Sequence, residues 1–151
     1  MNSSVKKLLH NHCKSHLTSR LLSYQKRNDE LYESLLSETK SSAGDKHETG
    51  RAMIQLEIEK TGNQIKETEK EYEYFLKTNN KVILKNVGNG SIVITNENLF
   101  YISVSAGVFN HGSKSYYCVS QNSPIGLELT GKKIKDIFIF KNKKSQIINI
   151  L

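Results

Sequence analysis

The sequence is poor in the residues that interrupt or cross-link a chain. Its 151 residues include one proline, two cysteines and no tryptophan, and no glycine precedes Gly44. Two cysteines, one in each half, exclude the disulfide framework of a small secreted domain, so we expect a reducing, cytoplasmic compartment. The first half is therefore open to long, unbroken helices.

Long apolar runs are also missing. No stretch approaches the roughly 20 apolar residues that cross a bilayer, and Met1–Leu17 holds no continuous apolar core of a signal peptide. We therefore expect no membrane partner. The sequence also has no glycine-rich phosphate loop, no metal-spaced cysteine pair and no paired nucleophile and base, so we do not expect an enzyme.

Charge is divided unevenly along the chain. Residues 1–78 hold 13 basic and 12 acidic residues, a net charge of +1, whereas residues 79–151 hold 9 basic and 3 acidic residues, a net charge of +6. A basic second half suits a nucleic acid or an acidic protein as its partner, although solubility alone explains it equally well.

Two heptad patterns occupy the first half. Across residues 4–40 and 47–78, seam residues recur at alternating steps of four and three, which predicts two long helices. Leu22, Tyr32 and Leu36 would widen the first seam, and Asn28 would fix its register at a cost in packing. The seam positions are Leu17, Leu21, Tyr24, Asn28, Leu31 and Leu35, then Ile54, Ile58, Thr61, Ile65, Thr68, Tyr72 and Phe75.

Helices of similar length joined by a short turn lie antiparallel, so residues 1–78 predict a coiled-coil hairpin. Its turn falls in the small, polar stretch 41–50. Asp45 and Glu48 stand three residues apart there, which places both carboxylates on one helical face. Such a pair is a weak site for Mg²⁺, which prefers oxygen ligands, although acids at a helix start commonly serve as caps.

Histidines gather near the start of the first segment. His12 and His16 have the spacing of a metal-binding pair, with His10 and Cys13 beside them. Cys13 is turned about 100° away from His12 on a helix, so a third ligand on the same face is missing. A solvated helix surface explains the cluster more simply than a metal site.

Residues 79–151 change to a period of two. We expect strands at 81–87, 91–95, 99–105 and 115–120, and a closing hairpin of 136–141 and 146–150 around residues 142–144. Ser123 as N-cap, Pro124 at the first helical position and Gly131 after the end predict one short helix. His111 would lie in an exposed loop. The fold class is α+β, with a helical hairpin before a small antiparallel sheet.

Several of these residues carry a family resemblance. The run 119–126, followed by Leu129-Thr130-Gly131-Lys132 and Asp136, resembles the "S-P-I…L-x-G-K…D" signature of bacterial Gre transcript-cleavage factors, a family of transcription elongation factors. Gly90-Ser91-Ile92-Val93 resembles the strand that precedes that signature. At the tip, Gly44-Asp45-Lys46-His47-Glu48 resembles the family's "G-D-x-x-E-N".

The resemblance implies an FKBP-like C-terminal domain over residues 79–151 that docks on RNA polymerase. The docking loop would hold Asn122, Ser123 and Pro124. The hairpin would enter the secondary channel, where Asp45 and Glu48 help to hold a catalytic Mg²⁺ beside the 3′ end of backtracked RNA. The polymerase then cleaves the RNA itself, and the factor, expected to be a monomer, binds no metal stably alone.

Two departures keep other functions open. Thr49 replaces the usual asparagine, and Gly50-Arg51-Ala52 stand where the family carries an aromatic residue. Glu38 also lies near the tip, so the working acids need not be only the matched pair. A secondary-channel regulator that does not stimulate cleavage is one alternative, and a coiled-coil adaptor unrelated to transcription is another.

Overall fold

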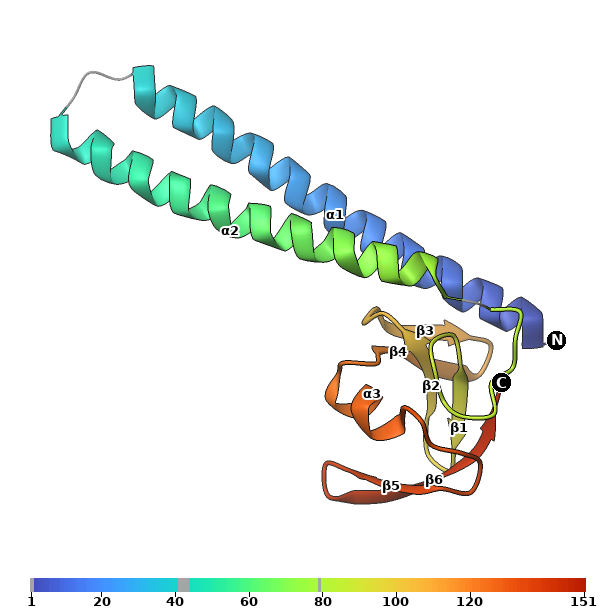
Figure 1. The fold of residues 1–151 in the computed structure, drawn as a ribbon. Coiled ribbons are helices and arrows are strands. Elements are labelled where there is room, and N and C mark those ends of the chain that lie inside the picture. Colours follow the sequence, from blue (N-terminus) through green and yellow to red (C-terminus); the bar gives the residue numbers. More distant parts are fainter. Residues whose placement is uncertain (1, 41–43, 79) are drawn as a thin grey trace. The chain divides into compact units, whose positions relative to one another are not determined.

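The computed structural model describes residues 2–40, 44–78 and 80–151, and the side chains of residues 2–3, 39–40 and 44–47 lie outside that description. Figure 1 shows the arrangement of the helices and the sheet. In chain order, the elements are α1 (Asn2–Lys40), α2 (Gly44–Leu76), β1 (Ile92–Thr95), β2 (Leu99–Ser103), β3 (Gly107–His111), β4 (Lys114–Ser120), α3 (Pro124–Leu129), β5 (Ile137–Phe140) and β6 (Lys143–Ile150).

The chain forms two compact units. One comprises Leu17–Glu73, and the other combines Met1–His16 with Tyr74–Leu151. The heptad pattern assigns residues 1–78 to the hairpin as a whole, whereas contacts group the first four turns of α1 with the sheet. The reason is that the apolar residues of these turns pack on a face of the sheet, as described below.

The seam of the hairpin unit follows the heptad prediction. Leu17, Leu31, Thr61 and Thr68 are buried, and the other seam positions between residues 17 and 73 are half-buried. The two helices run antiparallel beside each other over this unit (Figure 1). Each helix buries one stripe against the other, as two-helix packing requires.

The prediction that three further residues of α1 widen the buried seam is wrong. Leu22, Tyr32 and Leu36 are 60%, 50% and 61% exposed, because a hairpin of only two helices offers no third surface to cover them. Ion pairs flank the seam instead. Arg20 reaches Glu71 at 2.7 Å and Arg27 reaches Glu57 at 3.9 Å, so opposite charges tie α1 to α2 at its borders.

The second unit is built on a six-stranded sheet with the strand order β3-β4-β2-β1-β6-β5. The predicted α+β class is confirmed, with one difference from an all-antiparallel sheet. Strands β2 and β4 pair in parallel, because β4 inserts between β2 and β3, and β3 pairs with it antiparallel. The sheet is therefore mixed.

Two details of the strand prediction need correction. Residues 81–87 form no strand in the described chain, since residues 81–86 are exposed and only Val87 is buried. Strand β3 was not expected, and His111 ends this strand rather than lying in a loop. The closing hairpin is confirmed, but it turns at Lys141-Asn142, where both residues have positive φ as a type I′ turn requires.

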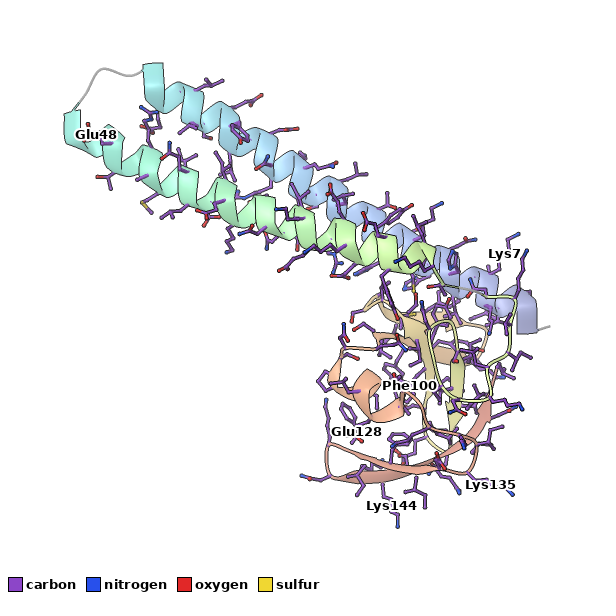
Figure 2. The ribbon with its side chains drawn as sticks, in the orientation of Figure 1. Lys7, Glu48, Phe100, Glu128, Lys135 and Lys144 are labelled. Carbon is purple, nitrogen blue, oxygen red and sulfur yellow. The ribbon has the colours of Figure 1, made fainter. Side chains whose placement is uncertain are left out.

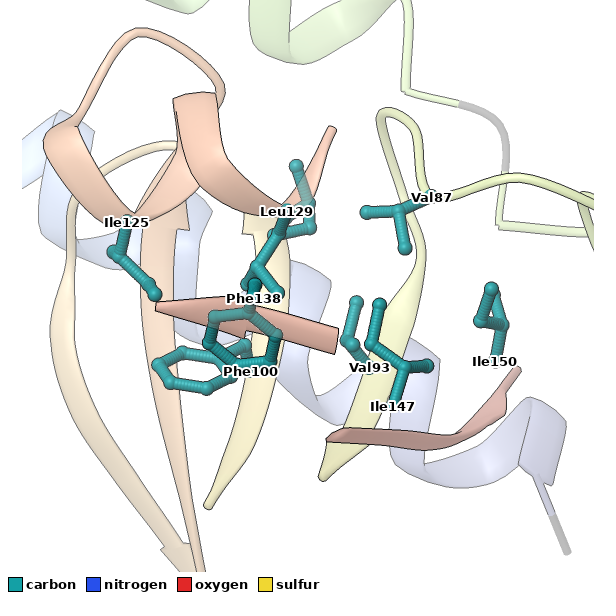
Figure 3. Packing of buried hydrophobic residues seen from close by; sticks show 9 residues of the cluster. Val87, Val93, Phe100, Ile125, Leu129, Phe138, Ile147 and Ile150 are labelled. Atoms are coloured by element: carbon teal, nitrogen blue, oxygen red, sulfur yellow. The ribbon is translucent and has the colours of Figure 1, made fainter. Parts of the chain in front are cut away.

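One face of the sheet carries the main hydrophobic core. Val93, Phe100 and Ile102 of the central strands meet Ile125 and Leu129 of α3 (Figure 3). Val87, Phe138, Ile147 and Ile150 complete this cluster. The short helix is therefore fixed over the sheet by its two buried apolar residues, which also sets the position of the loop before it.

The opposite face is covered by the start of α1. Because side chains alternate along a strand, Tyr101 and Ser103 point away from Phe100 and Ile102, yet both are fully buried. Val5 shares a small cavity with Ile92 and Tyr116. The sheet is thus sandwiched, with α3 on one side and residues 4–16 on the other.

Candidate functional sites at the hairpin tip and the α3 loop

The tip acids lie at the start of α2. This helix begins at Gly44, so Asp45 and Glu48 occupy its first turns at a spacing of three residues, as predicted. Glu48 is exposed to solvent and is labelled at the end of the hairpin in Figure 2. The side chain of Asp45 lies outside the described residues. The backbone therefore places the two acids on neighbouring positions of one helical face.

A third acid reaches this end of the hairpin from α1. The carboxyl group of Glu38 lies 3.5 Å from the position that a Cβ on Gly50 would occupy. Glu38 is half-buried and already has an interaction partner. Arg51 follows Gly50 in the sequence, and its Nε atom is buried without a hydrogen-bond partner among the described residues.

Carboxylate oxygens fit the chemistry of Mg²⁺, which takes six oxygen ligands and retains several waters. Within the described residues, no group of three or more histidine, cysteine, aspartate or glutamate side chains is arranged to hold a metal. Glu48 is exposed, so its carboxylate is accessible to a second molecule.

The loop before α3 is ordered by Ser123. Its hydroxyl donates a 2.7 Å hydrogen bond to the carbonyl oxygen of Ser120 and accepts a 3.1 Å bond from the backbone N–H of Gly126. Its backbone N–H donates to the Ser120 hydroxyl at 3.1 Å. The predicted N-cap is therefore confirmed, and the hydroxyl of Ser123 is committed to holding the helix start.

The residues beside Ser123 are accessible. Asn122 and Pro124 are exposed, and Leu127, one turn further on, is 66% exposed. Gln121 accepts a hydrogen bond from the hydroxyl of Tyr74, which fixes the other side of the loop. Of the three expected docking residues, Asn122 and Pro124 present surface, whereas Ser123 shapes the loop that presents them.

The histidine cluster has a packing role. His12 Nε2 lies 2.8 Å from the carbonyl oxygen of Ala106, and its ring lies 5.1 Å from that of Phe109. The ring of His10 stacks on Phe75 at 4.3 Å. These contacts hold the start of α1, residues 4–16, against the rest of the sheet unit. A helical wheel could not reveal them, because their partners lie about 65 to 97 residues away along the chain.

Burial lowers the pKa of His10, because the positively charged imidazolium is poorly solvated there, and the nearby Lys14 lowers it further. The Nδ1 atom of His10 is buried without a described partner. A neutral ring is thus favoured in the folded chain, which suits a side chain that packs on a phenylalanine.

A cavity was not foreseen. It measures about 420 Å³ and lies beside α3 and the β5–β6 hairpin, where Phe100, Tyr117, Phe138 and Phe140 supply much of its wall. An ion pair of 2.8 Å between Lys143 and Glu97 borders it. Alternate residues of β4 and β5 line this cavity. In the sequence, the alternation of residues along these two strands was the only indication of it.

These parts define a class of protein: a two-helix hairpin with acids at its end, in a chain whose remaining part is a mixed α+β sheet domain. No helix in the described ranges is long and apolar enough to cross a membrane. No family model and no curated protein matches the sequence.

Two solved structures are similar to this chain. One is the crystal structure of GreA factor homolog 1 (Gfh1) of Thermus thermophilus, with 15% identity, a TM-score of 0.38, and coverage of 91% of this chain and 93% of that one. The other is the structure of the transcription factor Gfh1, with 17% identity, a TM-score of 0.36, and coverage of 90% and 91%.

Proposed function

We propose that this protein is a transcription factor that binds RNA polymerase through its C-terminal domain and inserts its hairpin into the secondary channel. There it would stimulate the polymerase's own cleavage of backtracked RNA. The observation that carries this proposal is the position of Asp45 and Glu48, at the start of α2 where the hairpin turns. The polymerase remains the enzyme, and this chain acts as an accessory factor.

The length of the hairpin supports delivery of these acids over a distance. A helix of 33 residues such as α2 is about 50 Å long at 1.5 Å per residue. Both helices end near residues 40–44, so the acids stand at an extreme of their own unit rather than along its shaft. A rigid two-helix support can carry side chains into a channel too narrow for a globular domain.

Docking is assigned to the loop before α3. Asn122 and Pro124 are exposed on a turn that three hydrogen bonds of Ser123 hold in place. The net charge of +6 on residues 79–151 favours an acidic surface or nucleic acid nearby. Proteins of this charge balance associate faster at low ionic strength, so binding should weaken as salt is added.

The chemical role of the tip is electrostatic. The active site of the polymerase would use two Mg²⁺ ions, and the ion held partly by the tip acids would help to stabilise the attacking and leaving oxygens of phosphodiester hydrolysis. Asp45 and Glu48 would contribute carboxylate oxygens from one side, and the polymerase would contribute the remaining ligands. Glu38 lies close enough to Gly50 to add negative charge to the same end of the hairpin.

The test is RNA shortening in a purified, backtracked polymerase complex. The wild-type protein should accelerate Mg²⁺-dependent cleavage, and Asp45→Asn with Glu48→Gln should reduce that acceleration on the order of 100-fold, as the loss of an electrostatic stabiliser does. Glu59→Gln, which removes an exposed acid from the shaft of α2, is the matched control and should retain full activity. Full stimulation by the double variant would refute the proposed role.

A second candidate function is a secondary-channel regulator that does not stimulate cleavage. It is favoured by the tip itself, where Thr49, Gly50 and Arg51 depart from the family pattern and Arg51 brings a positive charge beside the acids. It predicts competition with a cleavage factor for polymerase and no shortened transcripts. Absence of any polymerase binding would instead favour an adaptor unrelated to transcription.

A further inference from the structure

Cys13 and Cys118 meet inside the second unit, although 104 residues separate them in the sequence. Cys13 lies on the fourth turn of α1 and is 0% exposed, and Cys118 lies on β4 and is 3% exposed. Both are free cysteines, and their thiols are in hydrogen-bonding contact with each other. The sequence placed one cysteine in each half and gave no signal that they meet.

Contacts of the neighbouring residues hold the pair in register. His12, which precedes Cys13, lies 2.8 Å from the carbonyl oxygen of Ala106 through Nε2. The backbone N–H of Ala106 in turn donates to the carbonyl oxygen of Cys118 at 3.2 Å. Cys118 is also fixed on both sides within the sheet, by pairing with Tyr101 of β2 and Gly107 of β3.

We propose that Cys13 and Cys118 are a redox modification site that forms an intramolecular disulfide and fastens the start of α1 to the sheet. The bond would close a loop that contains all of residues 14–117. A cross-link over so long a loop restricts the unfolded chain strongly and so favours the folded state. This role is independent of polymerase binding and of the tip acids.

Each thiol changes the pKa of the other. The pKa of Cys13 is lowered, because Cys118 donates a hydrogen bond to its thiolate and the backbone of Val104 adds another, against the opposing effect of burial. The pKa of Cys118 is raised by its hydrogen bond to Cys13, by burial and by the charge on Cys13. The thiolate is the reactive form, so whichever of the two cysteines is deprotonated when peroxide arrives attacks first, and the other resolves the intermediate.

With hydrogen peroxide as the oxidant, the steps balance. With Cys13 as the thiolate, its sulfur attacks one peroxide oxygen, the O–O bond breaks, and the products are a sulfenic acid and hydroxide, which takes up a proton as water. The sulfur of Cys118 then attacks the sulfur of Cys13, and the S–O bond breaks. The departing hydroxide takes the proton of Cys118 and leaves as a second water. The two sulfurs have lost two electrons, and the peroxide has gained them.

Burial sets the rate of this reaction. Neither thiol is exposed enough to meet peroxide in the closed state, so residues 4–16 must lift from the sheet first. Oxidation should therefore be slow, and its rate should follow hydrogen exchange of the amides in residues 4–16. Such gating is compatible with a transient, sensing disulfide of the kind found in reducing compartments.

The test treats the full-length protein with hydrogen peroxide in native buffer, followed by peptide mapping by mass spectrometry without reductant. We expect a peptide pair joining Cys13 to Cys118 at the loss of two hydrogen atoms, a higher melting temperature, and reversal of both by dithiothreitol. Cys13→Ser and Cys118→Ser should each abolish the linked pair and the rise in melting temperature under peroxide.

Wild-type protein alone also decides the outcome, so the test does not depend on folding of the variants. The proposal is overturned if peroxide leaves both thiols free, links separate chains, or takes either cysteine to sulfinic acid with no linked pair. It is equally overturned if the link forms in urea but not in native buffer, because the folded contact would then play no part.

Discussion

The carbonyl oxygen of Ser120 occupies the space that a Cβ atom on Gly126 would need. A side chain at position 126 would penetrate that backbone oxygen and also approach the hydroxyl of Ser123 at 2.9 Å. The loop and the first turn of α3 are therefore packed backbone to backbone, and glycine is required there by space alone.

Gly126→Ala should accordingly destabilise the sheet unit by about 1–3 kcal/mol, the usual cost of overpacking a rigid site. Urea unfolding of the full-length protein measures this as a lower transition midpoint. Gly62→Ala is the matched control, because nothing lies within 4 Å of a Cβ on this exposed residue of α2. It should gain up to about 1 kcal/mol from helix propensity. Equal effects of the two substitutions would contradict the packing described here.

Substitutions at Ser123 and Asn122 should distinguish the stability of the loop before α3 from its role in binding polymerase. Ser123→Ala removes the N-cap of α3 and should cost about 1 kcal/mol of unfolding free energy. Ser123→Thr should recover most of it, because a threonine hydroxyl can both accept from the N–H of Gly126 and donate to the carbonyl oxygen of Ser120. Asn122→Ala, at an exposed position, should leave stability unchanged and weaken polymerase binding in a pull-down. A loss of stability in Asn122→Ala as large as that of Ser123→Ala would refute this division.

Asn28 is a polar interruption of the hairpin seam. Its Oδ1 atom is buried and lacks a hydrogen-bond partner among the described residues. Asn28→Leu should therefore raise the unfolding free energy by about 1 kcal/mol or more, because an unsatisfied polar atom is replaced by packed apolar surface. Asn63→Leu, on the exposed face of α2, is the control and should change stability little. A drop in stability for Asn28→Leu would show that the amide is satisfied in solution.

The lowered pKa of His10 predicts that the free energy of unfolding decreases as the pH falls. Its pKa is lowered in the folded chain by burial and by Lys14, so the unfolded chain binds the proton more readily. Its contribution to stability is therefore complete above about pH 6.5, the ordinary histidine value, and is lost as the pH falls toward the lowered folded pKa.

Unfolding free energies measured by urea titration across this range test that sign. His10→Phe should keep the stack on Phe75 and flatten the profile. Lys14→Gln should flatten it partly, because it removes only the second cause of the shift. A wild-type profile that His10→Phe leaves unchanged would show that other groups produce the pH dependence.

Periodicity predicted the elements whose own residues carry a regular pattern. The short helix capped by Ser123 and the closing hairpin depend on residues close in sequence. The seam from Leu17 to Tyr72 joins more distant residues, since Arg20 and Glu71 at its border are 51 positions apart, but each helix carries its own heptad stripe. Periodicity misplaced Leu22, Tyr32 and Leu36, because an apolar residue beside a seam is buried only if a further element covers it.

The features that were missed depend on distant partners. Strand β3 is an edge strand with mostly exposed side chains, so Gly107–His111 carries no apolar alternation. Val82, Ile83 and Leu84 resemble a strand in composition but remain exposed without a pairing strand. The packing of residues 4–16 on the sheet, and the meeting of Cys13 with Cys118, could not be inferred from local spacing at all.

The acids at the tip depend on a second molecule in a way that the fold does not. The second heptad segment was expected from residue 47, whereas α2 begins at Gly44, so Asp45 and Glu48 both lie within its first turns. Their role with Mg²⁺ stays a prediction, because a coordination shell shared with another molecule depends on ligands that this chain does not contain.

The Mg²⁺ concentration that gives half-maximal RNA cleavage in a purified, backtracked polymerase complex tests this role most directly. Carboxylates that help to hold the metal should lower that concentration, so the wild-type protein should shift it downward and the variant carrying Asp45→Asn and Glu48→Gln should not. If wild type and the double variant give the same Mg²⁺ dependence and the same cleavage rate, the tip does not act through the metal and the central proposal fails.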